Sequence, residues 1–349
     1  MKRARTLGRR AALAAAVCLL LVAAAGCGGG GSKSTTTTTG GSSATGGNSK
    51  VKKVAFFGFA AANSFAQATW AGVQQQAKKV GVGTKFFDPN FNAQTQVSQI
   101  QDAITTNQYQ VFVVQANDGN AVVPAVKQAI KQGITVVGEF TPIGSDYATD
   151  QPQVPGMIFV GEAPVKNGEL LGKLGIEACG NLNPCKLAYL QGFKSLPLDN
   201  ARTDAVMKML KTAKNVQVVA SPEGGYTQAS GLKAAQDVLS AHPDLNVMIG
   251  SSQAIEGAQQ AVRSAGKLGK IKLIGNGGSC QAVRGVLAGN WYAAYLIAER
   301  SSGAKATELG IKAANGQNVP KSFNTEQLQN PLGTKPVIEK TNFHAQYCD

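Results

Sequence analysis

From Val51 onward, short apolar runs alternate with longer segments in which apolar residues recur every three or four positions. The short runs are nearly continuous in apolar residues, which is typical of strands that a parallel sheet buries on both faces. The longer segments predict helices, and the first presents one apolar face and ends at Gly81, a residue suited to a left-handed cap. The strands predicted in this first series cover residues 51–59, 84–87, 111–115, 135–140 and 157–161.

A second series of strands and helices begins at Lys186. Its predicted strands cover residues 186–191, 216–220, 247–250 and 271–275. Two such series predict an α/β protein with two doubly wound parallel-sheet lobes. In sheets of this kind a ligand binds beyond the carboxyl ends of the strands, so the segments that follow the strands are where binding residues are expected.

The first 26 residues follow a different pattern. Five basic residues precede an apolar run over residues 11–25, which ends in Ala24-Ala25-Gly26-Cys27. This run of about 15 residues is too short to span a bilayer comfortably, and small residues at its end suit a signal peptidase. We therefore predict a signal peptide over residues 1–26, cleavage before Cys27, and an exported protein.

The sequence around Cys27 resembles the bacterial lipobox, with Ala24 where leucine is usual. The resemblance implies that Cys27 is acylated and anchors the mature protein to the outer face of the cytoplasmic membrane. The alternative is an ordinary signal peptide that leaves Cys27 as an unmodified thiol. Residues 27–50 are rich in Gly, Thr and Ser, a composition that cannot bury a core, and are predicted to form a tether.

The distribution of charge argues against nucleic-acid binding. The formal net charge is +14, but removal of the leader leaves 29 basic and 20 acidic residues, a balance of +9. The basic residues are scattered, and no zinc-finger, basic-zipper or helix-turn-helix pattern occurs. The composition is that of an ordinary globular protein, and 349 residues suffice for two domains.

Apart from Cys18 in the leader and Cys27 at the anchor position, the chain has four cysteines, an even number that predicts disulfides in an oxidising compartment. Cys179 and Cys185 flank a segment with Gly, Asn and Pro that favours a turn, so we expect them to pair. Cys280 and Cys348 would then form the second bond. Metal binding is the alternative, but the chain has only two histidines, neither has ligand spacing, and no metal site is predicted.

The loop after the first predicted strand, residues 58–65, brings an amide and an aromatic ring to the expected crevice. The amide of Asn63 can form hydrogen bonds with hydroxyl groups, and the ring of Phe65 can stack on the apolar face of a sugar. Both residues are therefore predicted to bind a ligand. The alternative is that Phe65 packs the loop onto the following helix.

Several segments resemble the ribose- and galactose-type periplasmic binding proteins, and the resemblance covers about residues 51–343. The order and spacing of these segments support the resemblance more strongly than any single motif does. The segments are the loop at 58–65, similar to an Asn-Pro-Phe loop; 94–104, similar to a Q…Q…I-D-A-I helix; 111–123, similar to a strand followed by D-x-x-A-V-V-P-A; 133–137, similar to A-G-I-P-V-V; and 239–245, similar to L-L-x-x-H-P-D-I.

This resemblance implies a type I periplasmic binding protein, in which three crossovers join the lobes and the ligand lies between them. Lobe 1 is expected over residues 51–151 and 298–318, lobe 2 over 152–297 and 319–349, and the hinges near Gln151, Ile297 and Asn318. Closure around the ligand would create the shape that an ABC permease in the membrane recognises. The protein would act as a monomer and without a cofactor.

Two further side chains match ligand-binding positions of that family. Arg202 lies at the start of a helix in the second lobe, where its guanidinium can donate several hydrogen bonds to hydroxyls or a carboxylate. The alternative for Arg202 is a surface pair with Asp199 or Asp204. Tyr226 falls where the family places a stacking aromatic residue, and its alternative is packing in the core or the hinge.

Other segments depart from the sugar-binding pattern, although the resemblance still places ligand contacts at Glu139, Phe140, Ser251, Asn276 and Ile297. This chain has Glu139-Phe140 where many members of the family have Asp-Arg, and Ser251-Ser252 where Asn-Asp is usual. It has Gly277 after Asn276 where an Asp normally ends the strand, and Ile297 where the family has Gln. The predicted site has thus lost charge and gained apolar surface. Because an unsatisfied buried hydroxyl costs about 1–3 kcal/mol, a simple pentose or hexose fits less well than the family suggests.

The predicted function is therefore capture of a small polar ligand, with a carbohydrate or carbohydrate-like molecule as the first choice. A less polar solute, an aromatic or cyclic acid held by Arg202, or a quorum-type signal are alternatives. A different role for the same fold is to present its ligand to a membrane sensor rather than to a permease.

Other classes of protein lack support in the sequence. No Gly-x-Ser-x-Gly elbow, Walker loop, histidine triad or Cys-x-x-Cys pair occurs, so no enzyme is predicted. Repressors of the lactose type share the two-lobed core but begin with a DNA-binding headpiece, whereas this chain begins with a leader and a tether.

Overall fold

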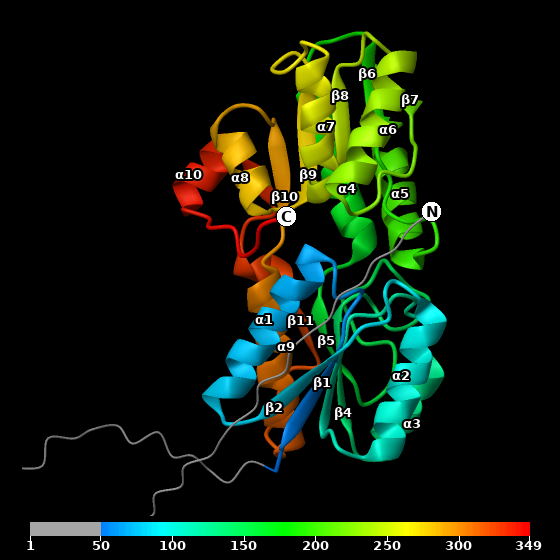
Figure 1. The fold of residues 1–349 in the computed structure, drawn as a ribbon, viewed down its shortest axis with the longest axis vertical. Coiled ribbons are helices and arrows are strands. Elements are labelled where there is room, and N and C mark those ends of the chain that lie inside the picture. The colour runs from blue at the N-terminus through cyan, green and yellow to red at the C-terminus, as the bar shows by residue number, and fades with distance from the viewer. Residues whose placement is uncertain (1–49) are drawn as a thin grey trace, which may run out of the picture. The chain divides into compact units, whose positions relative to one another are not determined.

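The first lobe is a parallel sheet with helices on both faces (Figure 1). The computed structural model describes residues 50–349, so the predicted signal peptide, Cys27 and the rest of the tether before residue 50 lie outside the described residues. The strands of this lobe are β1 (Lys53–Phe57), β2 (Gly83–Phe87), β3 (Val111–Val114), β4 (Thr135–Phe140), β5 (Ile158–Gly161) and β11 (Ser322–Asn324), in the order β11-β5-β4-β3-β1-β2. Its helices are α1 (Ser64–Lys79), α2 (Ala93–Thr106), α3 (Val123–Lys131) and α9 (Glu299–Ala314).

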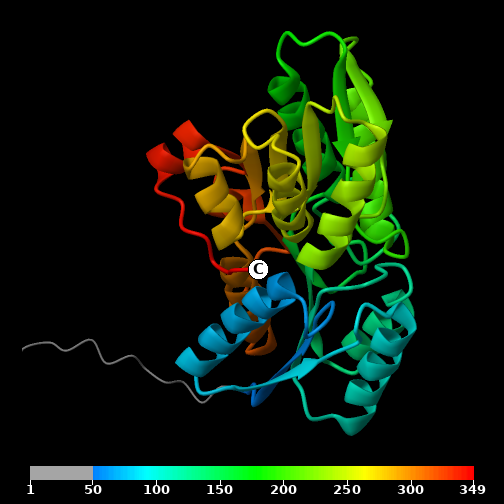
Figure 2. The same ribbon diagram turned by 45° about the horizontal axis from the view of Figure 1, so that its top comes forward.

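The second lobe repeats this architecture (Figure 2). Its strands are β6 (Cys185–Tyr189), β7 (Val216–Ala220), β8 (Val247–Ser251), β9 (Lys272–Gly277), β10 (Ala293–Leu296) and β12 (Leu332–Thr334), in the order β12-β10-β9-β8-β6-β7. Only the edge strand β12 is antiparallel to its neighbour. The helices are α4 (Pro164–Cys179), α5 (Pro197–Leu210), α6 (Gln228–Ala241), α7 (Ser252–Ser264), α8 (Cys280–Leu287), α10 (Lys335–Thr341) and the 3-10 turn η1 (Thr325–Leu328).

Alternation along the strands explains why each sheet is covered on both faces. In β1, Val54 and Phe56 pack with residues of α1 and α9, whereas Ala55 and Phe57 pack with residues of α2 and α3. All four side chains are fully buried. Because successive side chains point to opposite faces of a sheet, a continuous apolar run buries both faces. The predicted fold class, two parallel-sheet α/β lobes, is confirmed.

Two of the three expected hinge positions are wrong. The crossover near Ile297 agrees with the structure, because β10 belongs to the second sheet and α9 packs on the first. The first crossover, however, follows β5 rather than Gln151, since Val137 of β4 pairs with Ile158. The third follows β11 rather than Asn318, since Ser322 pairs with Phe159. Residues 152–161 and 319–324 therefore belong to lobe 1 and not to lobe 2.

The first expected boundary fails because the segment between β4 and β5 looks like a linker in the sequence but packs as part of the first lobe. Residues 141–157 contain no regular element, yet Ile143, Val154 and Met157 are buried against α2 and α3. The four-residue strand β5 then completes the buried sheet before the chain crosses over.

Both predicted disulfides are present. Cys179 at the end of α4 is bonded to Cys185 at the start of β6, and Cys280 at the start of α8 is bonded to Cys348 near the C-terminus. All four cysteines of residues 50–349 are thus bonded to one another, which contradicts the alternative that they bind a metal. The part of the chain that the structure describes contains no helix long and apolar enough to cross a bilayer.

Candidate functional site

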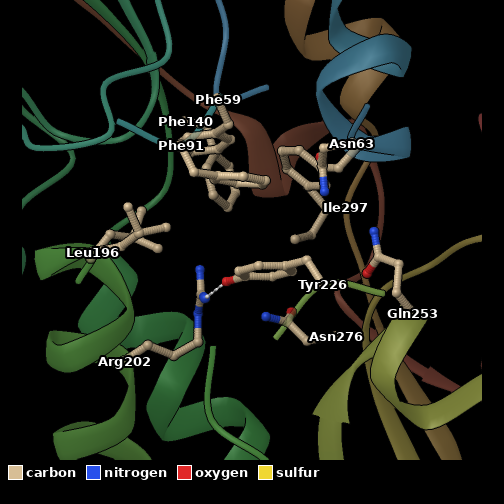
Figure 3. A pocket seen from close by; sticks show the side chains of 12 residues that line it. Phe59, Asn63, Phe91, Phe140, Leu196, Arg202, Tyr226, Gln253, Asn276 and Ile297 are labelled. Carbon is tan, nitrogen blue, oxygen red and sulfur yellow. Dashed lines mark hydrogen bonds between the residues drawn. The ribbon is translucent and has the colours of Figure 1, made fainter. Parts of the chain in front are cut away.

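A pocket with an empty volume of about 450 Å³ lies where the carboxyl ends of the two sheets face each other (Figure 3). Strand ends and the helix starts that follow them supply most of its lining. The lining side chains are Phe59, Asn63, Phe65, Phe91 and Phe140 from the first lobe, Leu196, Leu198, Arg202, Tyr226, Gln253 and Asn276 from the second, and Ile297 from a crossover.

Four phenylalanine rings of the first lobe form one connected group. Phe140 makes edge contacts with Phe65 at 4.8 Å and with Phe59 at 6.2 Å between ring centroids, and Phe59 stacks on Phe91 at 6.3 Å. Phe91 and Phe140 both have a positive φ, 58° and 61°. Bulky residues rarely adopt this conformation, and such strain concentrates at ligand sites.

Phe91 also connects the two lobes. Its ring lies 5.1 Å from that of Phe193 and 6.1 Å from that of Tyr226, both in the second lobe. The amide of Gln253 in α7 adds a polar contact between lobes, donating to the hydroxyl of Ser64 in α1 at 3.0 Å. The two lobes are therefore in contact around the pocket, as expected for a closed arrangement.

Arg202 belongs to a buried hydrogen-bonded group on the side of the second lobe (Figure 3). Its Nη1 donates to Asp199 Oδ1 at 2.7 Å and to Tyr226 Oη at 3.3 Å, and its Nε donates to Asn167 Oδ1 at 2.6 Å. Asp199 also accepts from the hydroxyl of Tyr226 at 2.5 Å. The predicted pair with Asp199 thus exists, but it is buried in the site rather than exposed at the surface.

The hydroxyl of Tyr226 is held as a donor by its surroundings. Burial, together with the carboxylate of Asp199, raises the pKa of Tyr226 well above its usual value, so the phenol stays protonated. The charge of Arg202 is balanced by Asp199, with which it forms an ion pair at 2.7 Å. The group therefore offers hydrogen-bond donors to the pocket without a net positive charge.

Packing between helices fixes the position of α5, which carries Arg202. Gly168 of α4 lies so close to α5 that a Cβ atom there would be 2.4 Å from the carbonyl oxygen of Arg202. Only glycine permits this approach. The helix that presents the guanidinium is consequently held tightly against its neighbour.

The structure brings seven of the nine predicted contact positions to this pocket. They are Asn63, Phe65, Phe140, Arg202, Tyr226, Asn276 and Ile297. Their role in ligand binding stays a prediction. The amide of Asn63 has a second task, because its Oδ1 caps α1 by accepting from the backbone of Ala66 at 2.9 Å.

Glu139 and Ser251 do not line this pocket, and a role for them in ligand binding stays a prediction. Glu139 is adjacent to Phe140 in β4 and therefore points to the opposite face, where it accepts from Gln115 at 2.9 Å and Ser302 at 2.6 Å. Ser251 caps α7, accepting from the amide of Ala254 and donating to the carbonyl of Gly225. It faces a smaller cavity behind Arg202 and Asn276.

Five lining residues were missed by sequence reasoning: Phe59, Phe91, Leu196, Leu198 and Gln253. Phe59 lies in the loop singled out after the first strand, and Phe91 follows the second strand, so the strand-end rule could have found both. Gln253 lies two positions after the predicted residue Ser251. Leu196 and Leu198 carry no such signal, because they reach the pocket only through the packing of α5.

Two buried carboxyl groups near the site predict how stability depends on pH. Burial raises the pKa of Glu139 to about 7, although the hydrogen bonds of this carboxylate lower its pKa. Burial likewise raises the pKa of Glu162, which accepts a hydrogen bond from Tyr295 Oη at 2.9 Å, to about 8. In the unfolded chain both groups titrate near 4.5. The stability that these groups contribute is therefore fully present below about pH 4.5. It is lost as the pH rises through about 7 for Glu139 and about 8 for Glu162.

We therefore expect the free energy of unfolding, measured with urea, to fall by a few kcal/mol between pH 5 and pH 8, since one pKa unit corresponds to about 1.4 kcal/mol. The double variant Glu139→Gln, Glu162→Gln should flatten this dependence. Glu308→Gln is the control, because the pKa of Glu308 is lowered by Lys305 and Lys312 and the group is ionised throughout this range. An unchanged slope in the double variant would contradict the assignment.

Two α/β lobes with a pocket between the carboxyl ends of their sheets define a two-lobed ligand-binding protein. The sequence profile of the family described as "Periplasmic binding protein domain" matches residues 54–318. The chain belongs to this family. The family consists of substrate-binding transport proteins, and membership implies an exported protein.

Individual relatives agree with this assignment. The chain is 24% identical over 281 residues to the ribose import binding protein RbsB of Escherichia coli (strain K12), covering 80% of this chain and 88% of that protein. It is 25% identical over 260 residues to the D-allose-binding periplasmic protein of the same organism, covering 71% and 80%. A solute binding protein from Mycobacterium smegmatis with bound glycerol has a similar structure, with a TM-score of 0.72, 24% identity and coverage of 85% and 99%.

Proposed function

We propose that this protein is an extracytoplasmic solute-binding protein that encloses a carbohydrate or carbohydrate-like molecule between its lobes and delivers it to an ABC importer. One observation carries the proposal: a single pocket is lined from the carboxyl ends of both sheets and flanked by contacts between the lobes. A site shared in this way is complete only when the lobes are closed, so ligand binding and closure stabilise each other.

The choice of a carbohydrate-like ligand rests on the relatives and on the chemistry of the lining. Relatives named for ribose, allose and xylose align with most of the chain. The pocket combines aromatic rings with amide and guanidinium donors, a combination that can cover the apolar face of a ring and bind its hydroxyls.

We assign no chemical step to the pocket. The two histidines lie away from it, His242 at the end of α6 and His344 in the C-terminal segment. Within residues 50–349 no group of three or more acidic, histidine or cysteine side chains could hold a metal ion. The polar lining residues are donors and acceptors suited to recognition rather than to nucleophilic attack.

The remaining features of the proposal concern the N-terminus and the assembly. A signal peptide over residues 1–26 would direct export, acylated Cys27 would anchor the protein, and residues 27–50 would hold the lobes away from the membrane. The protein would act as a monomer whose membrane partner is an ABC permease.

A thermal-shift screen of the purified full chain tests the function. D-ribose, D-allose, D-xylose, D-galactose and myo-inositol are compared with small acids and cyclic non-sugar compounds. A binder present at 100 times its Kd should stabilise the protein by about 2.7 kcal/mol. A response only to acids or non-sugar compounds would contradict the carbohydrate reading.

The same screen with two variants locates the site. Phe91→Ala should reduce the shift, because the ring contacts both lobes around the pocket. Phe323→Ala removes a partly buried ring that is not part of the lining and should leave the shift unchanged. An equal shift in wild type and Phe91→Ala would place the binding site elsewhere.

A further inference from the structure

The hydrogen-bonding capacity of the pocket is largely consumed by the protein itself. Asn276 exchanges hydrogen bonds with Asn167, and the hydroxyl of Tyr226 donates to Asp199. Asn63 Oδ1 caps α1, and Gln253 Nε2 donates to Ser64. Counting partners within residues 50–349, three polar side-chain atoms of the lining have no partner at all: Asn63 Nδ2, Arg202 Nη2 and Gln253 Oε1.

The rest of the lining is apolar. Four phenylalanine rings approach from the first lobe, and two leucines with Ile297 complete the wall. A hexopyranose carries five hydroxyls and a ring oxygen, whereas the three unpartnered atoms offer four N–H donors and a single acceptor oxygen for five hydroxyl hydrogens. Each buried hydroxyl left without a partner lowers affinity roughly five- to a hundredfold. A fully hydroxylated ring is therefore poorly matched to this pocket.

A charged ligand is also poorly matched. Arg202 is already neutralised by Asp199 at 2.7 Å, and both side chains are buried. A carboxylate entering the pocket would add a buried negative charge that no cation of the lining balances. Burial of an uncompensated charge is strongly unfavourable, so the pocket selects uncharged molecules.

We propose that the ligand is a neutral, ring-shaped molecule with an apolar face, such as a deoxy or O-methyl sugar, because the pocket surrounds that face with phenylalanine rings and offers few unused hydrogen-bonding groups. Arg202 Nη2 and Asn63 Nδ2 would donate to its remaining oxygens, and Gln253 Oε1 would accept from one hydroxyl. This inference rests on the proposed function and narrows its substrate class.

Isothermal titration of the full chain with matched pairs tests the inference. The pairs are D-galactose with D-fucose, its 6-deoxy form; D-glucose with 6-deoxy-D-glucose; and D-ribose with 2-deoxy-D-ribose, together with the methyl glycosides of D-galactose and D-glucose and with D-galacturonate. In at least one pair the deoxygenated or methylated member should bind ten times more tightly than its parent, and D-galacturonate should not bind.

Each outcome has a defined meaning. Parents that bind as tightly as their deoxygenated partners, or tight binding of D-galacturonate, would overturn the inference and leave the proposed function intact. Binding by no member of the panel would overturn both.

A variant pair tests the physical cause. Ile297→Gln adds a hydrogen-bonding group to the wall and should reduce the preference for the deoxygenated partner at least threefold, whereas Ile297→Leu should retain it. An unchanged preference in Ile297→Gln would count against the inference, and the wild-type titrations decide it independently if that variant does not fold.

Discussion

Arg202→Ala is expected to abolish measurable ligand binding and to lower the free energy of unfolding by about 3–5 kcal/mol. The guanidinium is 5% exposed and donates to Asn167, Asp199 and Tyr226. Its removal leaves the carboxylate of Asp199 buried without a cation. This uncompensated buried charge is the main reason for the expected loss of stability. Urea denaturation measures the stability, and titration with the strongest binder of the sugar screen measures the affinity.

A second variant separates the two effects. Arg202→Met combined with Asp199→Leu removes both charges, and apolar replacement of a buried ion pair is often neutral for stability. We expect this double variant to recover most of the lost stability but none of the binding. Arg263→Ala, at an exposed position in the last turn of α7, is the control and should change stability by less than about 0.5 kcal/mol. Normal affinity in Arg202→Ala would remove Arg202 from the site.

The positions of the strands could be predicted because burial on both faces of a sheet leaves a local signal. The strands Thr135–Phe140 and Val216–Ala220 have the predicted bounds, and most others differ by one to three residues. Three strands were missed: the edge strands β11 and β12, which have three residues each and are not fully buried, and the inner strand β10, which is fully buried but has only four residues. The third hinge was misplaced because β11 was missed, and the first because β5, although predicted as a strand, was assigned to the second lobe.

The site was predictable at the carboxyl ends of strands. Phe140 and Asn276 lie at the ends of β4 and β9, and Asn63 lies in the loop after β1; all three line the pocket. Glu139 shows the limit of this prediction: a shift of one position along a strand reverses the face, and the sequence does not reveal which of two neighbours points into the crevice. The pairing of Asn276 with Asn167, more than 100 residues apart, depends on the packing of α4 against β9 and has no local signal.

The disulfide between Cys280 and Cys348 is expected to stabilise the protein more than the bond between Cys179 and Cys185. The first closes a loop with a sequence separation of 68 residues and the second one of only 6. Loop-closure entropy predicts losses of about 4 and about 2 kcal/mol, respectively, when each pair is replaced by serine. Urea denaturation of the two double variants under the same conditions compares these losses.

The two bonds should also differ in their effect on closure, because only Cys348 holds a segment that contacts both lobes. In the second lobe, the backbone of Asp349 exchanges hydrogen bonds with Gln281. In the first lobe, the side chain of Asp349 accepts from Ser64 at 2.8 Å, next to Asn63 of the pocket, and Gln346 forms hydrogen bonds with Ser301 of α9.

The double variant Cys280→Ser, Cys348→Ser should free this segment and raise the radius of gyration measured by small-angle X-ray scattering. It should also weaken binding about five- to tenfold, the equivalent of one or two hydrogen bonds. The double variant Cys179→Ser, Cys185→Ser, at the opposite ends of the strands, is the control and should leave both measurements unchanged. Equal effects of the two double variants on binding would show that the C-terminal segment does not stabilise the closed form.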